Sequence, residues 1–136
     1  MITAIETNIL LDILRPNDQF AEASEAALQG ALADGSLVIC DLVYAELCAH
    51  FLNQSECDSF LREAQIRVES ITRPAAFLAS RTWRQYRLSG GTRERILADF
   101  IIGAHAQHQA SRLLTRDRGF YRKMFPSLRI VEPATG

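Results

Sequence analysis

The chain has 136 residues, of which 48% are hydrophobic and 23% are charged, and its net charge is −1. These values are typical of a single folded domain and exclude a disordered chain. The apolar runs are far shorter than the ~20 residues of a membrane-spanning helix, so we expect no membrane partner.

Strand and helix patterns alternate along the chain. From the N-terminus they predict a strand at 2–5, a helix at 8–14 ending before Pro16, a helix at 20–33 and a strand at 37–40. They continue with a helix from an N-cap at Asp41 to residue 53, a helix at 56–65 capped by Ser55, and a strand at 67–71. The C-terminal part predicts a helix at 73–88, a helix at 92–109 capped by Thr92, a strand at 112–115, a helical turn near Tyr121 and an edge strand at 128–131.

This alternation predicts the fold class. Four or five short strands separated by helices indicate an α/β protein, with a parallel sheet flanked by helices on both faces. The sequence contains no repeat and no interdomain linker, so we expect one domain over residues 1–133 and a short tail at 134–136.

Two features bear on the compartment. The N-terminus lacks the basic segment of a signal peptide, and Glu6 falls where an apolar segment would be. Cys40, Cys48 and Cys57 are an odd number and form no C-x-x-C motif. We therefore expect reduced thiols and a cytoplasmic protein.

Charge is distributed unevenly along the chain. Residues 1–64 carry eleven acids and two bases, whereas residues 65–136 carry thirteen bases and five acids. Fourteen of the fifteen bases are arginine, whose planar guanidinium matches phosphate. The asymmetry suggests a polyanion partner, and it is equally compatible with solvated helix faces or a surface for an acidic protein.

Acidic residues follow the predicted strands. Glu6 ends the first strand, Asp117 follows the strand at 112–115, and Glu46 lies one to two turns into the helix after the second strand. Because parallel strands end at one edge of a sheet, where ligands bind, we expect these carboxylates to converge there. For Glu46 alone, an ordinary solvated helix position is the favoured alternative.

Asp99 is the most informative acid, because it interrupts the apolar helical segment 96–102. A lone buried carboxylate there requires a partner charge, a shifted pKa or a metal ion. The alternative is an Arg95–Asp99 pair one turn apart on an exposed face. Asp12, also near the first strand, is expected on the surface.

Four converging carboxylates repel one another unless cations lie between them. Oxygen ligands suit Mg²⁺ or Mn²⁺, which orient water and neutralise charge at a phosphodiester. The histidines His50, His105 and His108 form no H-E-x-x-H motif, so we do not expect a zinc site.

Two basic segments are candidates for substrate contact. Residues 112–129 hold five arginines and Lys123 against a single acid. Phe120 and Tyr121 lie among them, and they are expected in the core rather than stacked on bases. In the helix at 73–88, Trp83 and Tyr86 interleave with arginines, so that helix is either an RNA or partner surface or an ordinary amphipathic helix.

Four segments together resemble the VapC family of PIN-domain toxins. They are Ile5–Asn8, Tyr44–Glu46, Leu97–Ala106 and Leu114–Tyr121, and the similarity extends over about residues 1–133. The resemblance implies a compact α/β/α fold, a usually dimeric metal-dependent endoribonuclease, and a small VapB-like antitoxin that blocks the acidic pocket.

The resemblance also implies the roles of individual residues. The catalytic and metal-binding acids correspond to Glu6, Glu46, Asp99 and Asp117, and the polar helpers that orient them to Thr7, Asn8 and Thr115. Glu46 is expected to bind the Mg²⁺ or Mn²⁺ directly, to bind it through water, or to take a proton. Candidates for RNA phosphate contacts are Arg116, Arg118 and Arg122.

One residue departs from the family pattern, because the family normally has aspartate where this chain has Glu6. The extra methylene moves the carboxylate by roughly 1–1.5 Å, beyond the ~0.5 Å tolerance of a positioned site. We therefore expect a weakened enzyme, through either a natural variant or a deliberate substitution. The alternatives are a non-catalytic RNA- or protein-binding module on the same fold and a phospho-receiver domain. The receiver is disfavoured because Lys123 is not at a strand end.

Overall fold

The structure is a computed structural model that describes residues 1–15 and 19–134. Its five strands are β1 (Ile2–Ile5), β2 (Ser36–Cys40), β3 (Ile66–Glu69), β4 (Arg112–Leu114) and β5 (Ile130–Val131). Its helices are α1 (Thr7–Leu14), α2 (Ala21–Asp34), α3 (Asp41–Cys48), α4 (Gln54–Glu63), α5 (Arg73–Leu88), α6 (Leu97–Gln109) and α7 (Arg118–Met124). No helix within these ranges is long and apolar enough to cross a membrane.

The strands form one parallel sheet in the order β3-β2-β1-β4-β5, which confirms the predicted fold class. The central strands are apolar and buried on both faces, as parallel sheets require. In β2, for example, Leu37, Val38 and Ile39 are each no more than 1% exposed. The predicted edge position of the last strand is also confirmed, because β5 pairs with β4 and ends the strand order.

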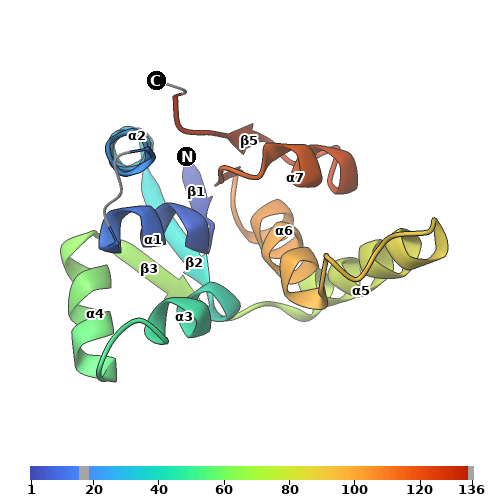
Figure 1. Ribbon diagram of the computed structural model, residues 1–136, viewed down its shortest axis with the longest axis horizontal. Coiled ribbons are helices and arrows are strands. Elements are labelled where there is room, and N and C mark those ends of the chain that lie inside the picture. Colours follow the sequence, from blue (N-terminus) through green and yellow to red (C-terminus); the bar gives the residue numbers. More distant parts are fainter. Residues whose placement is uncertain (16–18, 135–136) are drawn as a thin grey trace.

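Helices cover both faces of this sheet. Figure 1 shows the strands between α1, α2 and α4 on one side and α5 and α6 on the other. The chain runs outward from β1 to β2 and β3, and it then crosses back through α5 and α6 to β4 on the far side of β1. Connections therefore leave β1 and β4 in opposite directions, and the carboxyl ends of these neighbours form the point where ligands bind in such sheets.

Aromatic side chains join α6 and α7 beside this point. The Phe100 and Phe120 rings meet edge to face at 5.2 Å, and the Phe120 and Tyr121 rings at 5.0 Å. Both α7 aromatics are buried, as predicted. Gly103 of α6 permits this packing, because a Cβ there would lie 2.4 Å from the Phe125 ring.

Three predicted helix starts are wrong, those of α3, α4 and α6. Asp41 is the first helical residue of α3 rather than its cap, and α3 ends at Cys48, five residues before the predicted end. The cap of α4 is Asn53 instead of Ser55, because the Asn53 side chain accepts a hydrogen bond from Glu56 N at 2.9 Å.

The largest difference lies before α6, which begins at Leu97 rather than after Thr92. The Thr92 hydroxyl instead accepts from Glu94 N at 3.4 Å, a local turn that competes with a helix. The carboxylate of Asp99 accepts from Ile96 N at 3.1 Å and marks the true helix start. Pro16 and residues 135–136 of the expected tail lie outside the described residues.

Candidate active site

Glu6 and Thr115 lie side by side where β1 and β4 end. The strands pair Ile5 with Leu114, and the Glu6 amide donates to the Leu114 carbonyl at 3.0 Å. Asp117 follows two residues later, and its amide donates to the Thr115 hydroxyl at 2.9 Å. The pairing thus brings two of the four predicted acids to one corner of the sheet.

Three side chains donate hydrogen bonds to the Glu6 carboxylate. The Thr115 hydroxyl and Asn8 Nδ2, the latter at 2.9 Å, donate to Oε2, and the Tyr121 hydroxyl donates to Oε1 at 3.1 Å. Glu6 itself is only 9% exposed. Burial keeps the pKa of Tyr121 above its usual range, so this hydroxyl remains a donor.

The pKa of Glu6 is raised above its ordinary value of 4.5. Burial is the largest cause, and the negative charges of Asp117 and Asp99 add to it. The hydrogen bonds from Thr115 and Tyr121 act in the opposite direction without cancelling the rise. The charges of the three acids therefore interact unfavourably with one another.

Asp117 has a cation beside it. The Arg95 guanidinium donates to Asp117 Oδ2 at 2.5 Å and lies 4.2 Å from the centre of the Phe120 ring. Both partners of the pair are about one-third exposed. The alternative Arg95–Asp99 pair is wrong, because Arg95 binds Asp117 and Asp99 caps α6.

Glu46 is connected to the same corner through Thr7. The Thr7 hydroxyl, on the first residue of α1, donates to Glu46 Oε1 at 2.8 Å. Glu46 itself is exposed on α3. The structure thus links the fourth predicted acid to the residue that follows Glu6.

The oxygen donors match a hard divalent cation in chemistry, although not in arrangement. In the two described ranges, no three acid, histidine or cysteine side chains are placed to hold a metal ion together. Asn8 Oδ1, however, is buried without a hydrogen-bond partner, next to the carboxylate to which Asn8 donates. An unsatisfied buried oxygen beside three acids fits a cation or its bound water.

Comparison with known proteins gives the family. The PIN domain family profile matches residues 4–126. The chain belongs to the PIN domain family. No curated protein sequence matches this PIN domain.

Solved structures share its fold. In VapBC2 from Rickettsia felis bound to a DNA fragment from their promoter, the TM-score is 0.72 at 18% identity, over 98% of this chain and 100% of that one. In VapBC-1 from nontypeable Haemophilus influenzae, it is 0.73 at 16%, over 97% and 98%. In FitAcB from Neisseria gonorrhoeae, it is 0.65 at 22%, over 96% of both. The predicted PIN fold is thus confirmed, and PIN domains are generally nucleases.

Sequence reasoning misplaced one acid of this PIN domain. Asp12 was expected on the surface, but it is 4% exposed. It accepts from the Ser24 hydroxyl at 2.6 Å and from Arg116 Nε at 2.7 Å and Nη2 at 3.0 Å. Since the pair links α1 to the segment after β4, it could not be found from nearby residues.

The candidate RNA-contacting arginines differ in their surroundings. Arg116 is engaged by Asp12, and Arg118 pairs with Glu132. Arg122 is exposed on α7, and so is Lys123. Arg122 is therefore the best placed of the three for a polyanion.

Two residues of the site were missed. The sequence predicts a core position for Tyr121, yet its hydroxyl contacts Glu6, and Arg95 binds Asp117 rather than Asp99. Tyr121 lies one helical turn after Asp117, a spacing that could have indicated a shared site. His105 is buried and bonds Glu69 at 2.9 Å, consistent with a structural histidine.

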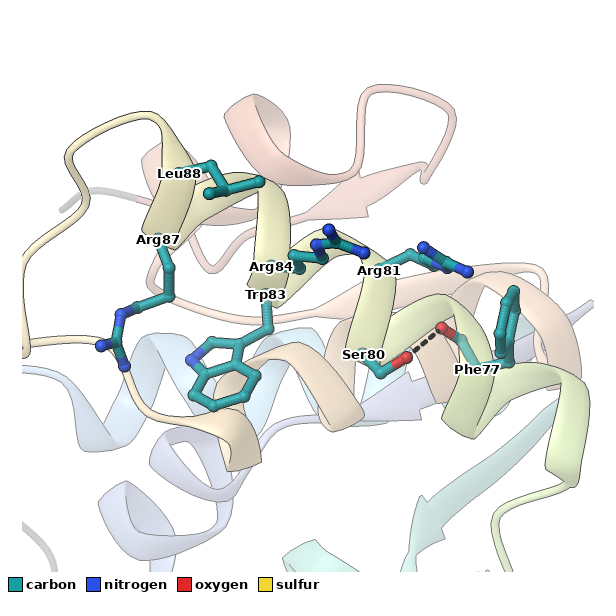
Figure 2. Close-up of a pocket in the computed structure, with 7 residues that line it drawn as sticks. All are labelled: Phe77, Ser80, Arg81, Trp83, Arg84, Arg87 and Leu88. Carbon is teal, nitrogen blue, oxygen red and sulfur yellow. Dashed lines mark hydrogen bonds between the residues drawn. The ribbon is translucent and has the colours of Figure 1, made fainter.

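The α5 surface of the PIN domain is a separate feature. Figure 2 shows a shallow pocket lined entirely by side chains of α5, among them Trp83 and three arginines. The Arg87 guanidinium lies 5.6 Å from the centre of the Trp83 ring, and Phe77 is 60% exposed. None of the four predicted acids lines this pocket.

Proposed function

We propose that this PIN-domain protein is a metal-dependent endoribonuclease of the toxin type. The observation that carries the proposal is the interaction of Glu6, at the end of β1, with Asp117 after β4 and Asp99 on α6, whose charges add to the rise in the pKa of Glu6 that burial causes. A negative cluster on a nuclease fold suits a divalent cation and a phosphodiester substrate. The fold likeness to VapBC and FitAcB supports the toxin assignment.

The cation would be held by Glu6, Asp99 and Asp117, with Glu46 binding directly or through water. Mg²⁺ or Mn²⁺ would lower the pKa of a bound water and neutralise charge on the substrate phosphate. Asn8 offers one further oxygen, because its Oδ1 has no partner among the described residues.

The side chains around the acids prepare the site. Thr115 and Tyr121 fix both oxygens of Glu6 by donating hydrogen bonds, and Thr7 fixes Glu46. Glu46, which is exposed, would accept a proton from the attacking water. Arg122 and Lys123 on α7 would hold the RNA backbone.

The partners follow from the same proposal. A small VapB-like antitoxin would cover the acidic cluster and block RNA access, and the active protein would be a homodimer in the cytoplasm. The protein from Klebsiella pneumoniae that shares this fold, with a TM-score of 0.66 at 20% identity over 98% of this chain and 99% of that one, is part of a toxin–antitoxin complex.

The test is cleavage of a mixed small-RNA pool with Mg²⁺ or Mn²⁺ and with chelator. Glu6→Asp should cut roughly tenfold faster than the unaltered chain, since it restores the family residue. Asp99→Asn should abolish cleavage, while its amide oxygen can still cap α6. Asp34→Asn, a change at an exposed acid, should cut like the unaltered chain.

Cleavage that survives chelator or Asp99→Asn would contradict the metal-dependent mechanism. Equal rates for the unaltered chain and Glu6→Asp would instead contradict only the impairment assigned to Glu6.

A non-catalytic RNA- or protein-binding module is the second candidate. It is favoured by the occupied state of the acids: both Glu6 oxygens accept hydrogen bonds from the protein, and Arg95 binds Asp117. Binding of RNA without cleavage by both the unaltered chain and Glu6→Asp, in the presence of Mn²⁺, would support it.

A further inference from the structure

Two cysteines from different helices lie in contact away from the acids. Cys48 is the last residue of α3 and Cys57 lies in α4, and the Cys48 thiol donates to Cys57 Sγ at 3.1 Å. Both are free thiols. A disulfide requires the sulfurs to approach to ~2.05 Å, so a shift of only about 1 Å would join them.

Other contacts hold α3 against α4 although no disulfide joins Cys48 and Cys57. The Tyr44 hydroxyl of α3 donates to Asp58 Oδ1 of α4 at 2.6 Å. The Phe51 ring, just after α3, and the Phe60 ring of α4 lie 5.7 Å apart. Since α3 and α4 are already docked, little further ordering is needed for the sulfurs to react.

The two thiols differ in access. Cys57 is fully buried, and burial together with contact with Cys48 raises its pKa to about 12, so it keeps its proton. Cys48 is partly exposed and is the thiol that an oxidant in solution can reach. Cys40, the third cysteine, is 1% exposed and lies in β2.

We propose that Cys48 and Cys57 form a site of reversible thiol oxidation, which a peroxide converts into a disulfide between α3 and α4. The Cys48 sulfur attacks the peroxide, the O–O bond breaks, and a sulfenic acid and water result. The Cys57 sulfur then attacks the sulfenic sulfur, the S–O bond breaks, and the hydroxide leaves as water with the Cys57 proton. The two thiols lose two electrons in total, and hydrogen peroxide gains them.

The disulfide would tie the end of α3 to α4. Glu46 lies two residues before Cys48 on α3, so the cross-link anchors the helix that carries an acid of the proposed site. The chemistry does not depend on nuclease activity, and its test is independent of the proposed function.

The experiment treats the full chain with hydrogen peroxide and measures intact mass, free thiols and peptides from a glutamate-specific protease. Cleavage after glutamate separates the cysteines, with Cys40 in peptide 26–46, Cys48 in 47–56 and Cys57 in 57–63. We expect the loss of two hydrogen atoms and two thiols, and a linked pair of the last two peptides that a reducing agent separates.

Variants distinguish this pair from general thiol oxidation. Cys40→Ala should form the same linked peptides, whereas Cys48→Ser should form none. Cys57→Ser should accumulate a sulfenic acid at Cys48 that a dimedone probe traps. The proposal is overturned if the unaltered chain gains oxygen atoms or keeps its thiols without linking these peptides, a result that needs no variant to fold.

Discussion

At the scale of single residues, Glu6 is the candidate acid that accepts the most hydrogen bonds. Its longer side chain is accommodated by a complete set of hydrogen bonds, because Thr115, Asn8 and Tyr121 all donate to its carboxylate. An aspartate at this position would withdraw the carboxylate by roughly 1–1.5 Å and loosen these contacts. Both oxygens of Glu6 accept hydrogen bonds from the protein, so the proposed cation would have to compete with these donors.

The raised pKa of Glu6 predicts that removing its charge stabilises the folded chain, by an amount that depends on pH. Ionised Glu6 is disfavoured in the folded chain, so the contribution of this one group to stability is most favourable below pH 4.5, falls as the pH rises through the raised folded pKa, and stays lower above it. Glu6→Gln removes this cost. In chelator at neutral pH, its melting temperature should rise by about 4 °C, corresponding to ~1 kcal/mol.

Melting curves at neutral and acidic pH check this prediction. The gain should shrink at acidic pH, where Glu6 of the unaltered chain is already protonated. A gain of the same size below pH 4.5 would show that the effect does not come from the charge of Glu6.

At the scale of elements, the loop before α6 places a cation at the site. Arg95 binds Asp117, and it is held over the Phe120 ring. Because the Asp117 hydrogen bond is the largest cause of the raised Arg95 pKa, the two groups stabilise each other's charge. Arg95 of this loop would therefore compete with the proposed divalent cation for Asp117.

Arg95→Gln should tighten Mn²⁺ binding by about tenfold, since it removes the competing charge from Asp117. Isothermal titration calorimetry with Mn²⁺ measures the change. Arg93→Gln is the matched control, because Arg93 is exposed on the same loop. Equal affinities of the two variants would show that Arg95 does not compete with the cation.

A second link between elements joins α1, α2 and the segment after β4 through Asp12. Asp12→Ala leaves Arg116 and Ser24 without their partner and should cost about 2–3 kcal/mol of unfolding free energy. Urea denaturation measures the loss. Glu132→Ala, which removes an exposed ion pair with Arg118, should cost less than about 1 kcal/mol. Similar losses in both variants would contradict the structural role of Asp12.

At the scale of the whole molecule, the charge asymmetry predicts salt-dependent RNA binding. Arg122 and Lys123 are exposed on α7, which begins directly after Asp117. Asp99→Asn should bind RNA without cutting it, with log affinity falling linearly as log salt rises.

Adding Arg122→Glu to Asp99→Asn should weaken binding and reduce the magnitude of that slope by about 1 or more. Adding Arg62→Glu, at an exposed arginine of the acidic half of the chain, should leave the slope unchanged. Filter binding over a salt series measures both, and equal slopes would remove α7 from the RNA surface.

Local patterns were sufficient for much of this protein. Buried apolar runs such as Leu37–Cys40 identify strands, because parallel strands are covered on both faces, and the helix predicted at 73–88 has the same bounds as α5. The acids at the strand ends follow from the same logic, since the carboxyl ends of parallel strands meet. The α/β class and the candidate acids therefore follow from the sequence alone.

Tertiary structure decided the partners of those acids. Tyr121 contacts Glu6 across 115 positions of sequence, and Arg116 contacts Asp12 across 104. Because α6 begins at Leu97 rather than after Thr92, Arg95 lies in the loop before the helix. There it binds Asp117 rather than Asp99. Which charge meets which carboxylate depends on how the strands pair, and that information is not contained in residues close together in the chain.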